Sequence, residues 1–258
     1  MGVKRNKAAP RPPEKTLRLP IIYILIAAIG WCGSPAWGSP PAPPAAVRGI
    51  IALDPGHGGK QAGSRSPQGI LEKDICLALV RRLALLLEPD FRVILTREDD
   101  YDVPLLERTG LANHQQADLF ISLHTAGGFV PATSGITIYT FKHAAQGTGS
   151  DQDSNDASTS ADWHRKQLPH TAASSSLAAL FQQQFEAVPG APAVRTAQAP
   201  LLVLGGAAMP AVLIEVGYLT HAATAERLNT PEGLTICAQA MARAIDSYFA
   251  AGRPSARP

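Results

Sequence analysis

Short apolar runs of strand length alternate with longer segments of helical periodicity between residues 49 and 249, and this alternation constrains the fold most strongly. The pattern predicts strands at 49–53, 91–96, 118–123, 136–141, 200–204 and 211–216, and helices at 72–87, 105–116, 177–187 and 231–249. Strands that alternate with helices predict a mostly parallel sheet covered on both faces. We therefore expect a single α/β domain over residues 49–250, built on a sheet of about six strands.

The first 38 residues have the layout of a secretory signal peptide. Six basic residues precede an apolar segment over 19–32, and the small residues Ala36 and Gly38 stand before Ser39. The apolar run contains Pro20 near its start and is shorter than the about 20 residues that a membrane-spanning helix needs. We therefore expect export to the periplasm, or to the cell wall or medium as the alternative, with no stable membrane span after cleavage.

Net charge and cysteine content limit the binding partners and the disulfides that the chain can have. Removing residues 1–38 changes the net charge from +2 to about −3, because that segment holds six basic residues and one acidic residue. A slightly acidic chain offers no basic face for phosphates, which argues against nucleic-acid binding. Cys76 and Cys237 remain, each in a predicted helix. An exported chain permits a disulfide between them, whereas apolar helix positions favour buried free thiols, and the sequence leaves both open.

Three segments lack the pattern of packed secondary structure. Residues 39–48 are rich in proline and predict a tether before the domain. Residues 142–176 are rich in Gly, Ser, Thr, Asp, Asn and Gln, which predicts a polar mobile loop. The tail over 251–258 is predicted to be disordered.

The glycine-rich segment Asp54-Pro55-Gly56-His57-Gly58-Gly59 follows the first predicted strand. Open α/β sheets collect their ligand sites at the C-terminal ends of strands, where a neutral imidazole can hold a metal ion. The simpler interpretation is a tight turn in which His57 has no role of its own. On the first interpretation, the glycines also let a bulky substrate approach the backbone closely.

Three further residues bear on the choice between a metal site and a tight turn. His124 follows the apolar run over 118–123, so it is expected at the same edge of the sheet as His57. Zinc in a hydrolase needs three protein ligands and one open position, and Glu72 at the start of a predicted helix can be the third ligand. Glu215 lies in an apolar strand, where burial would raise its pKa toward the range of a general base. The alternatives are a hydrogen-bonded His124, a Glu72 that complements the helix dipole and a solvated Glu215.

Five motifs, in order along the chain, resemble the type 3 N-acetylmuramoyl-L-alanine amidases, which are zinc-dependent hydrolases of bacterial peptidoglycan. The motifs are Asp54–Gly59, Gly69–Asp74, Glu107–Asn113, Ala117–His124 and Met209–Thr220. The resemblance implies one Zn²⁺ ion bound by His57, Glu72 and His124, with Glu215 as the catalytic residue. It also implies hydrolysis of the amide between the lactyl group of N-acetylmuramic acid and L-alanine of the stem peptide.

Two positions depart from the family pattern. Ala126 stands where members usually have asparagine two residues after the second zinc histidine, and His221 stands where asparagine commonly follows Thr220. The metal ligands survive both changes. One alternative is therefore a wall-binding protein that kept the metal but lost turnover, and another is a zinc peptidase or deacetylase on the same residues.

The resemblance makes a muropeptide the expected substrate. It leaves a protein activator open, because some relatives carry an inhibitory helix in the region of residues 142–176, although the polar composition here gives such a helix little support. We expect a monomer.

Overall fold

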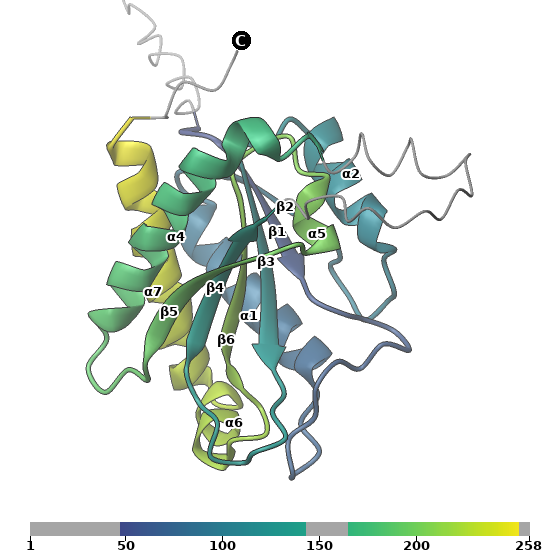
Figure 1. Cartoon of the computed structure of the whole chain (residues 1–258), viewed down its shortest axis with the longest axis vertical. Helices are drawn as coiled ribbons and strands as arrows, with labels where there is room; N and C mark the ends of the chain where they lie inside the picture. The colour runs from purple at the N-terminus through teal and green to yellow at the C-terminus, as the bar shows by residue number, and fades with distance from the viewer. Residues whose placement is uncertain (1–46, 143–164, 253–258) are drawn as a thin grey trace, which may run out of the picture. The chain divides into compact units, whose positions relative to one another are not determined.

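The computed structural model describes residues 47–142 and 165–252. Within these ranges a six-stranded sheet has the order β2-β1-β3-β6-β4-β5 (Figure 1). Its strands are β1 (Ile50–Pro55), β2 (Arg92–Leu95), β3 (Leu119–Ala126), β4 (Ile136–Phe141), β5 (Val194–Ala199) and β6 (Ala211–Tyr218). The pairs β1–β2, β1–β3, β3–β6 and β4–β5 are parallel, and β4 pairs with β6 antiparallel. The predicted α/β class with a mostly parallel sheet is confirmed.

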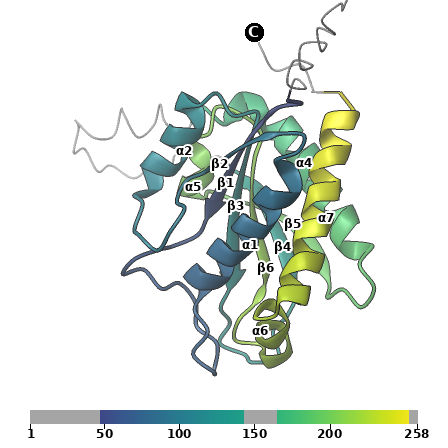
Figure 2. The same ribbon diagram turned by 180° about the vertical axis from the view of Figure 1, so that it is seen from behind.

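Helices cover the two faces of this sheet unequally. The back face carries α1 (Glu72–Leu87), α4 (Thr171–Glu186) and α7 (Pro231–Ala250), and Figure 2 shows α1 and α7 from that side. The front face carries the shorter helices α2 (Leu105–His114) and α5 (Leu202–Gly205). Two further short elements, η1 (Leu168–His170) and α6 (Ala222–Leu228), connect these helices to the sheet.

The strand period of two separates the residues of the two faces. In β3, Leu119, Ile121 and Leu123 belong to the large apolar core of the back face, whereas Phe120 belongs to a smaller core under α2 and α5. Further along the same front face come Ser122 and then His124. The front face therefore changes from apolar to polar toward the C-terminal end of β3.

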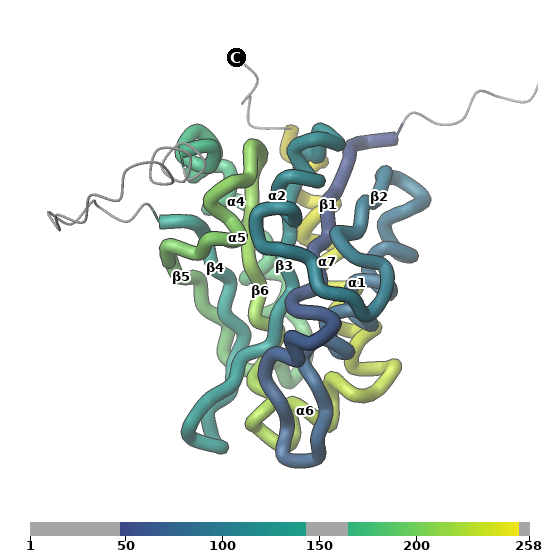
Figure 3. Tube along the Cα trace, turned by 90° about the vertical axis from the view of Figure 1, so that its right-hand side faces the viewer, coloured from purple at the N-terminus to yellow at the C-terminus, as the bar shows by residue number. Residues whose placement is uncertain are grey.

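Three connections gather at that end of the sheet. Figures 1 and 3 show the loop over 56–71, the β3–β4 connection over 127–135 and α6 at the same end. This is the end at which β1, β3 and β6 terminate. The fold thus collects loops from distant parts of the sequence around the polar part of the front face.

The predicted strand over 200–204 is wrong. Those residues include most of α5, and the edge strand is β5, which comes earlier in the chain. Val203 and Leu204 form a buried helical turn that fills the front-face core. A short apolar run fits a strand or a buried helical turn equally well, and here tertiary packing selects the helix.

The predicted loop over 142–176 is wrong in its last part. Helix α4 begins at Thr171, six residues before the predicted start. The serines that suggested a loop make local bonds: the hydroxyls of Ser175 and Ser176 donate to the carbonyls of Thr171 and Ala172 one turn earlier. Ser174 is fully buried and donates to the side chain of Gln167. Residues 143–164 lie outside the described ranges.

Several predictions fall wholly or partly outside the described residues. These are the signal peptide over 1–38, most of the tether and the tail from residue 253. Among the described residues, no helix combines the length and apolarity that a membrane span requires. Cys76 and Cys237 are both buried free thiols, so the disulfide left open by the sequence is not formed.

Candidate metal centre

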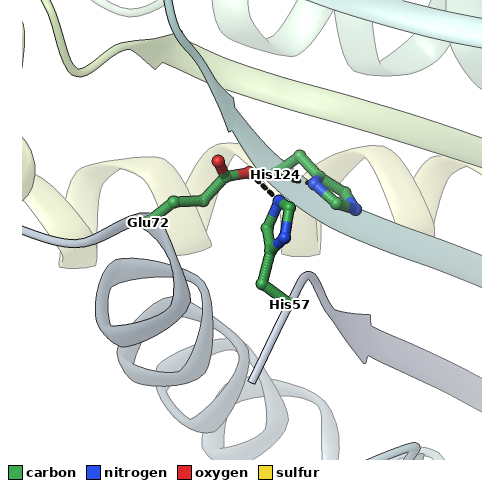
Figure 4. A group of neighbouring side chains, drawn as sticks. All are labelled: His57, Glu72 and His124. Carbon is green, nitrogen blue, oxygen red and sulfur yellow. Dashed lines mark hydrogen bonds and ion pairs between the residues drawn. The ribbon is translucent and has the colours of Figure 1, made fainter. Parts of the chain in front are cut away.

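Three side chains from separate segments converge at the C-terminal end of the central strands (Figure 4). His57 comes from the loop after β1, Glu72 is the first residue of α1, and His124 lies in β3. One nitrogen or oxygen atom from each lies within 4.8 Å of the others. Glu72 Oε1 is 3.2 Å from His57 Nε2 and 2.9 Å from His124 Nδ1. The structure thus brings together the three residues that the sequence analysis grouped.

The turn that carries His57 has an unusual backbone. His57 has φ +59, which is uncommon for a residue with a side chain, and Gly58 and Gly59 follow with φ +132 and +55. Such a turn points carbonyl groups inward, and these groups need donors.

Two buried arginines supply the donors. Arg97 donates to the carbonyls of Pro55 and Gly56, and Arg108 donates to those of Pro55 and His57, at 2.8 to 3.0 Å. The two side chains are 0% and 3% exposed. These hydrogen bonds hold the backbone of the His57 turn in place.

Asp54 balances part of this buried positive charge. Its carboxylate lies 2.8 Å from Arg108 Nη1 and accepts hydrogen bonds from the hydroxyls of Thr96 and Ser122. Asp54 thus fixes Arg108, which in turn donates to the carbonyls of the turn.

Two glycines of the loop make room for the converging side chains. A Cβ atom at Gly56 would lie 2.5 Å from the ring of His124. A Cβ atom at Gly63 would lie 2.5 Å from Glu72 Oε2 and 2.6 Å from His57 Cδ2. At both positions the close neighbours are the protein's own site residues, so the missing side chain makes room for them.

Backbone groups also fix the Glu72 carboxylate. Oε2 accepts from the N–H of Ser64 at 2.7 Å, and Oε1 accepts from the N–H of Thr125 at 3.0 Å. Burial acts to raise the pKa of Glu72, but hydrogen bonds with His124, His57 and Ser64 outweigh it and lower the pKa below its ordinary value. The group is therefore ionised at neutral pH and can serve as an oxygen ligand.

Glu215 lies beside this cluster. It pairs with His124 in the β3–β6 register, and both side chains are on the front face. Burial raises the pKa of Glu215, although the positive charge of Arg195 and a hydrogen bond from Tyr139 are among the influences that oppose the rise. The side chain of Glu215 is half-buried, whereas the apolar strand predicted that it would be buried. His124 was predicted to follow its strand, but it lies inside β3.

The donor set fits zinc. Two imidazole nitrogens and one carboxylate oxygen form a set found in catalytic zinc sites, which keep a fourth position open. Zinc bonds of about 2.0–2.2 Å at tetrahedral angles separate neighbouring ligand atoms by about 3.4 Å. The distances of 2.9 and 3.2 Å to Glu72 Oε1 are close to this value. The side chains of His57 and His124 are 28% and 21% exposed, which leaves the cluster open to a substrate.

The two departures from the family pattern have different surroundings. Ala126 is 6% exposed, and its carbonyl accepts from the N–H of Leu219. His221 is the N-cap of α6, and its Nδ1 accepts from the N–H of Thr224 at 3.3 Å. A histidine here performs the capping that asparagine performs in many helices.

Sequence reasoning missed Arg97 and the contacts of Ser64 and Thr125. The two hydroxyls lie 2.9 Å apart and link the loop to β3. The backbone N–H groups that bind Glu72 belong to the same two residues. Backbone donors leave no mark in side-chain composition, and nothing in the sequence distinguishes a buried arginine from an exposed one.

Comparisons with known proteins cover the region that contains this site. The family described as N-acetylmuramoyl-L-alanine amidase matches residues 51–247. N-acetylmuramoyl-L-alanine amidase AmiC of Escherichia coli is 28% identical over 230 residues, which cover 81% of this chain and 54% of AmiC. AmiC of Neisseria meningitidis is 28% identical over 220 residues, which cover 78% of this chain and 53% of the relative. The chain therefore spans about half the length of these relatives.

Solved structures of amidases superpose on the same region. N-acetylmuramoyl-L-alanine amidase AmiC2 of Nostoc punctiforme has a TM-score of 0.61 at 28% identity, covering 79% of this chain and 98% of AmiC2. The catalytic domain of CwlV from Bacillus (Paenibacillus) polymyxa var. colistinus has a TM-score of 0.63 at 25% identity, covering 78% and 98%. Because the family match spans more than half of the chain and includes every candidate site residue, this chain belongs to the N-acetylmuramoyl-L-alanine amidase family.

Proposed function

We propose that this protein is a zinc-dependent amidase of peptidoglycan that hydrolyses the bond between N-acetylmuramic acid and L-alanine during cell-wall remodelling or daughter-cell separation. The convergence of His57, Glu72 and His124 beside Glu215, inside the family match, carries the proposal. Relatives named N-acetylmuramoyl-L-alanine amidase support the substrate class.

The residues divide the chemistry between them. His57, Glu72 and His124 would hold one zinc ion, and such an ion supplies a Lewis acid that polarises a carbonyl oxygen and acidifies water. Glu215 lies one strand away from His124, at a spacing of about 4.8 Å between strands. Its carboxylate is therefore near enough to take a proton from the attacking water.

Proton transfer by Glu215 completes the hydrolysis. The water oxygen bonds to the lactyl carbonyl carbon, and the bond from that carbon to the alanine nitrogen breaks. Glu215 passes the proton it received to the departing nitrogen. Because burial raises the pKa of Glu215, its carboxylate accepts a proton more readily than an ordinary carboxylate does.

The proposed location follows from the sequence of residues 1–38. We propose export to the periplasm with cleavage before Ser39. Sequencing the N-terminus of protein recovered from a periplasmic fraction tests this. A mature chain that begins at Ser39 is expected, and a chain that retains Met1 contradicts it.

Digestion of purified sacculi tests the reaction. The wild type is expected to release new L-alanine amino termini while glycan chains stay intact. Glu215→Gln is expected to lose activity by about 10²–10⁴-fold, the usual contribution of a general base, with zinc content unchanged. Ile214→Val, a neighbour on the back face, is the matched control and keeps activity.

Other products identify the alternatives. Cleavage within the stem peptide indicates a peptidase, and release of acetate indicates a deacetylase. A wild type that binds zinc and sacculi but releases nothing indicates a wall-binding protein, the alternative to which Ala126 draws attention.

A further inference from the structure

Four polar residues form one row across four neighbouring strands. His124 of β3 pairs with Glu215 of β6, Glu215 pairs with Thr137 of β4, and Thr137 pairs with Arg195 of β5. Residues directly opposite one another in neighbouring strands point to the same face. The row therefore crosses the front face from the candidate metal centre to the edge strand.

The guanidinium group of Arg195 leans inward along this row. Its Nε donates to Thr137 Oγ1 at 3.0 Å, and its Nη2 donates to Tyr218 Oη at 3.4 Å. Tyr218 is on β6, three residues after Glu215. Two strand spacings separate the Cα atoms of Arg195 and Glu215 by about 10 Å, and the inward lean brings the charge closer than that.

Arg195 differs from the two buried arginines of the site. Arg97 and Arg108 are buried and donate to backbone carbonyls, and Arg108 also pairs with Asp54. Arg195, in contrast, is exposed and donates to two neutral hydroxyls. None of the ion pairs found within residues 47–142 and 165–252 includes Arg195. A guanidinium has five N–H donors in a fork that matches a carboxylate, and these two bonds use two of them.

The chemistry of the substrate identifies the anion that the free donors of Arg195 can bind. In N-acetylmuramic acid the lactyl carboxyl group is consumed by the scissile amide, so the sugar side offers no carboxylate there. The peptide side offers one on the residue after L-alanine when that residue is acidic. A peptide residue spans about 3.5 Å, so this carboxylate lies one to two residues from the scissile bond, within the distance that the row covers.

We propose that Arg195 binds the carboxylate of the stem-peptide residue that follows L-alanine, so that the protein prefers an acidic second residue over its amidated form. The proposal rests on the proposed function, because it orients the peptide side of that substrate over β4 and β5. Arg195 is then a substrate-binding residue at the edge of the front face.

Binding to a variant without turnover tests the preference. The ligands are N-acetylmuramoyl-L-alanyl-D-glutamate and its amide, in which the carboxylate nearest the alanine is a carboxamide. Calorimetric titration of zinc-loaded Glu215→Gln is expected to show about tenfold tighter binding of the acid, the value of a partly exposed charge-assisted hydrogen bond. Adding Arg195→Met is expected to remove this difference, and adding Arg195→Lys is expected to retain part of it.

Arg92→Met is the matched control. Arg92 is an exposed arginine on β2, at the opposite edge of the sheet, and its loss is expected to leave the tenfold preference intact. Thermal unfolding and zinc content of each variant establish that Arg195→Met folds and loads normally.

Three results overturn the inference. These are a preference that survives Arg195→Met, an equal loss of affinity for both ligands in that variant, and the absence of binding to either ligand. Failure of the proposed function has a different signature, because the wild type would then hydrolyse neither ligand although the charge preference in binding persists.

Discussion

The two faces of the sheet share every strand but differ in what they bury. On the back face, Leu123 and Ile214 lie in a continuous apolar core beneath α1, α4 and α7. One residue along each strand, His124 and Glu215 lie on the front face, beyond the part that α2 and α5 cover. The backbone alternation of a strand thus places a stabilising side chain and a candidate site residue next to each other in the sequence.

The difference teaches that burial of a charge does not identify a site. Asp54, Arg97 and Arg108 are more deeply buried than His57 or His124, yet their polar atoms bind one another, hydroxyls and backbone carbonyls. The candidate metal centre is recognised instead by ligand atoms that converge while part of each imidazole stays exposed.

The largest effect is expected from adjacent residues on opposite faces. His124→Ala is expected to lose bound zinc and, with it, on the order of 10³-fold or more of the activity. Leu123→Ala is expected to keep one zinc per chain and to lose about 2–5 kcal/mol of unfolding free energy through the cavity it leaves. Zinc analysis and urea unfolding of the metal-free proteins measure both quantities. Equal losses of zinc and of stability in the two variants would contradict the claim that the two faces have different roles.

The next largest effect is expected from the buried charges that support the His57 turn. Arg108→Met removes the partner of Asp54, which is 0% exposed, and is expected to cost about 3–5 kcal/mol of unfolding free energy. The double variant Asp54→Asn/Arg108→Met is expected to recover part of this, since no unpaired charge remains. A loss below about 1 kcal/mol in urea unfolding of the single variant shows that the pair is not needed.

Two glycines of one loop give a smaller and more selective effect. Gly63 and Gly69 both have positive φ, at +70 and +88, so alanine strains each backbone by about 1–2 kcal/mol. Only at Gly63 does the new methyl group meet Glu72 and His57, whereas nothing lies within 4 Å at Gly69. Gly63→Ala is expected to weaken zinc binding by about 10–100-fold, and Gly69→Ala is expected to leave it unchanged. Competition with a zinc chelator measures this, and equal weakening in both variants contradicts it.

The smallest effect concerns a thiol on the back face. Burial raises the pKa of Cys237 to about 12. An acid whose pKa is higher in the folded than in the unfolded chain contributes stability that is complete below about pH 9 and is lost as pH rises toward 12. The wild type is therefore expected to lose about 1 kcal/mol more than Cys237→Ala between pH 8 and 10. Parallel urea titrations with the same pH dependence for both proteins would refute the buried thiol's role.

Apolar periodicity predicted the covered parts of the fold. The bounds of α1 and β4 agree with the sequence analysis, because Ile75, Leu79 and Leu83 repeat at helical spacing and Ile136 and Ile138 alternate. Apolar periodicity failed at the exposed edge of the sheet. β5 has the sequence Val-Arg-Thr-Ala-Gln-Ala and packs only in part, so it carries no apolar alternation, and α6 was missed because seven residues are too few for a periodic signal.

The converging residues could be predicted because parallel strand ends meet at one edge of a sheet. His57 and His124 follow or end such strands, and Glu72 starts the helix that returns from the first one. The support of the site could not be predicted, since the bonds of Arg97 to the carbonyls of Pro55 and Gly56 exist only after the chain has folded. The row that ends at Arg195 also depends on β5, which the sequence analysis missed.

Anomalous X-ray diffraction at the zinc edge, from crystals of the full chain grown with zinc, tests the central claim most directly. One ion is expected within about 2.0–2.2 Å of a nitrogen of His57, a nitrogen of His124 and a carboxylate oxygen of Glu72, with no ion at the Asp54–Arg108 pair. An anomalous peak elsewhere, or none at the three residues when zinc analysis finds one ion per chain, would contradict the account.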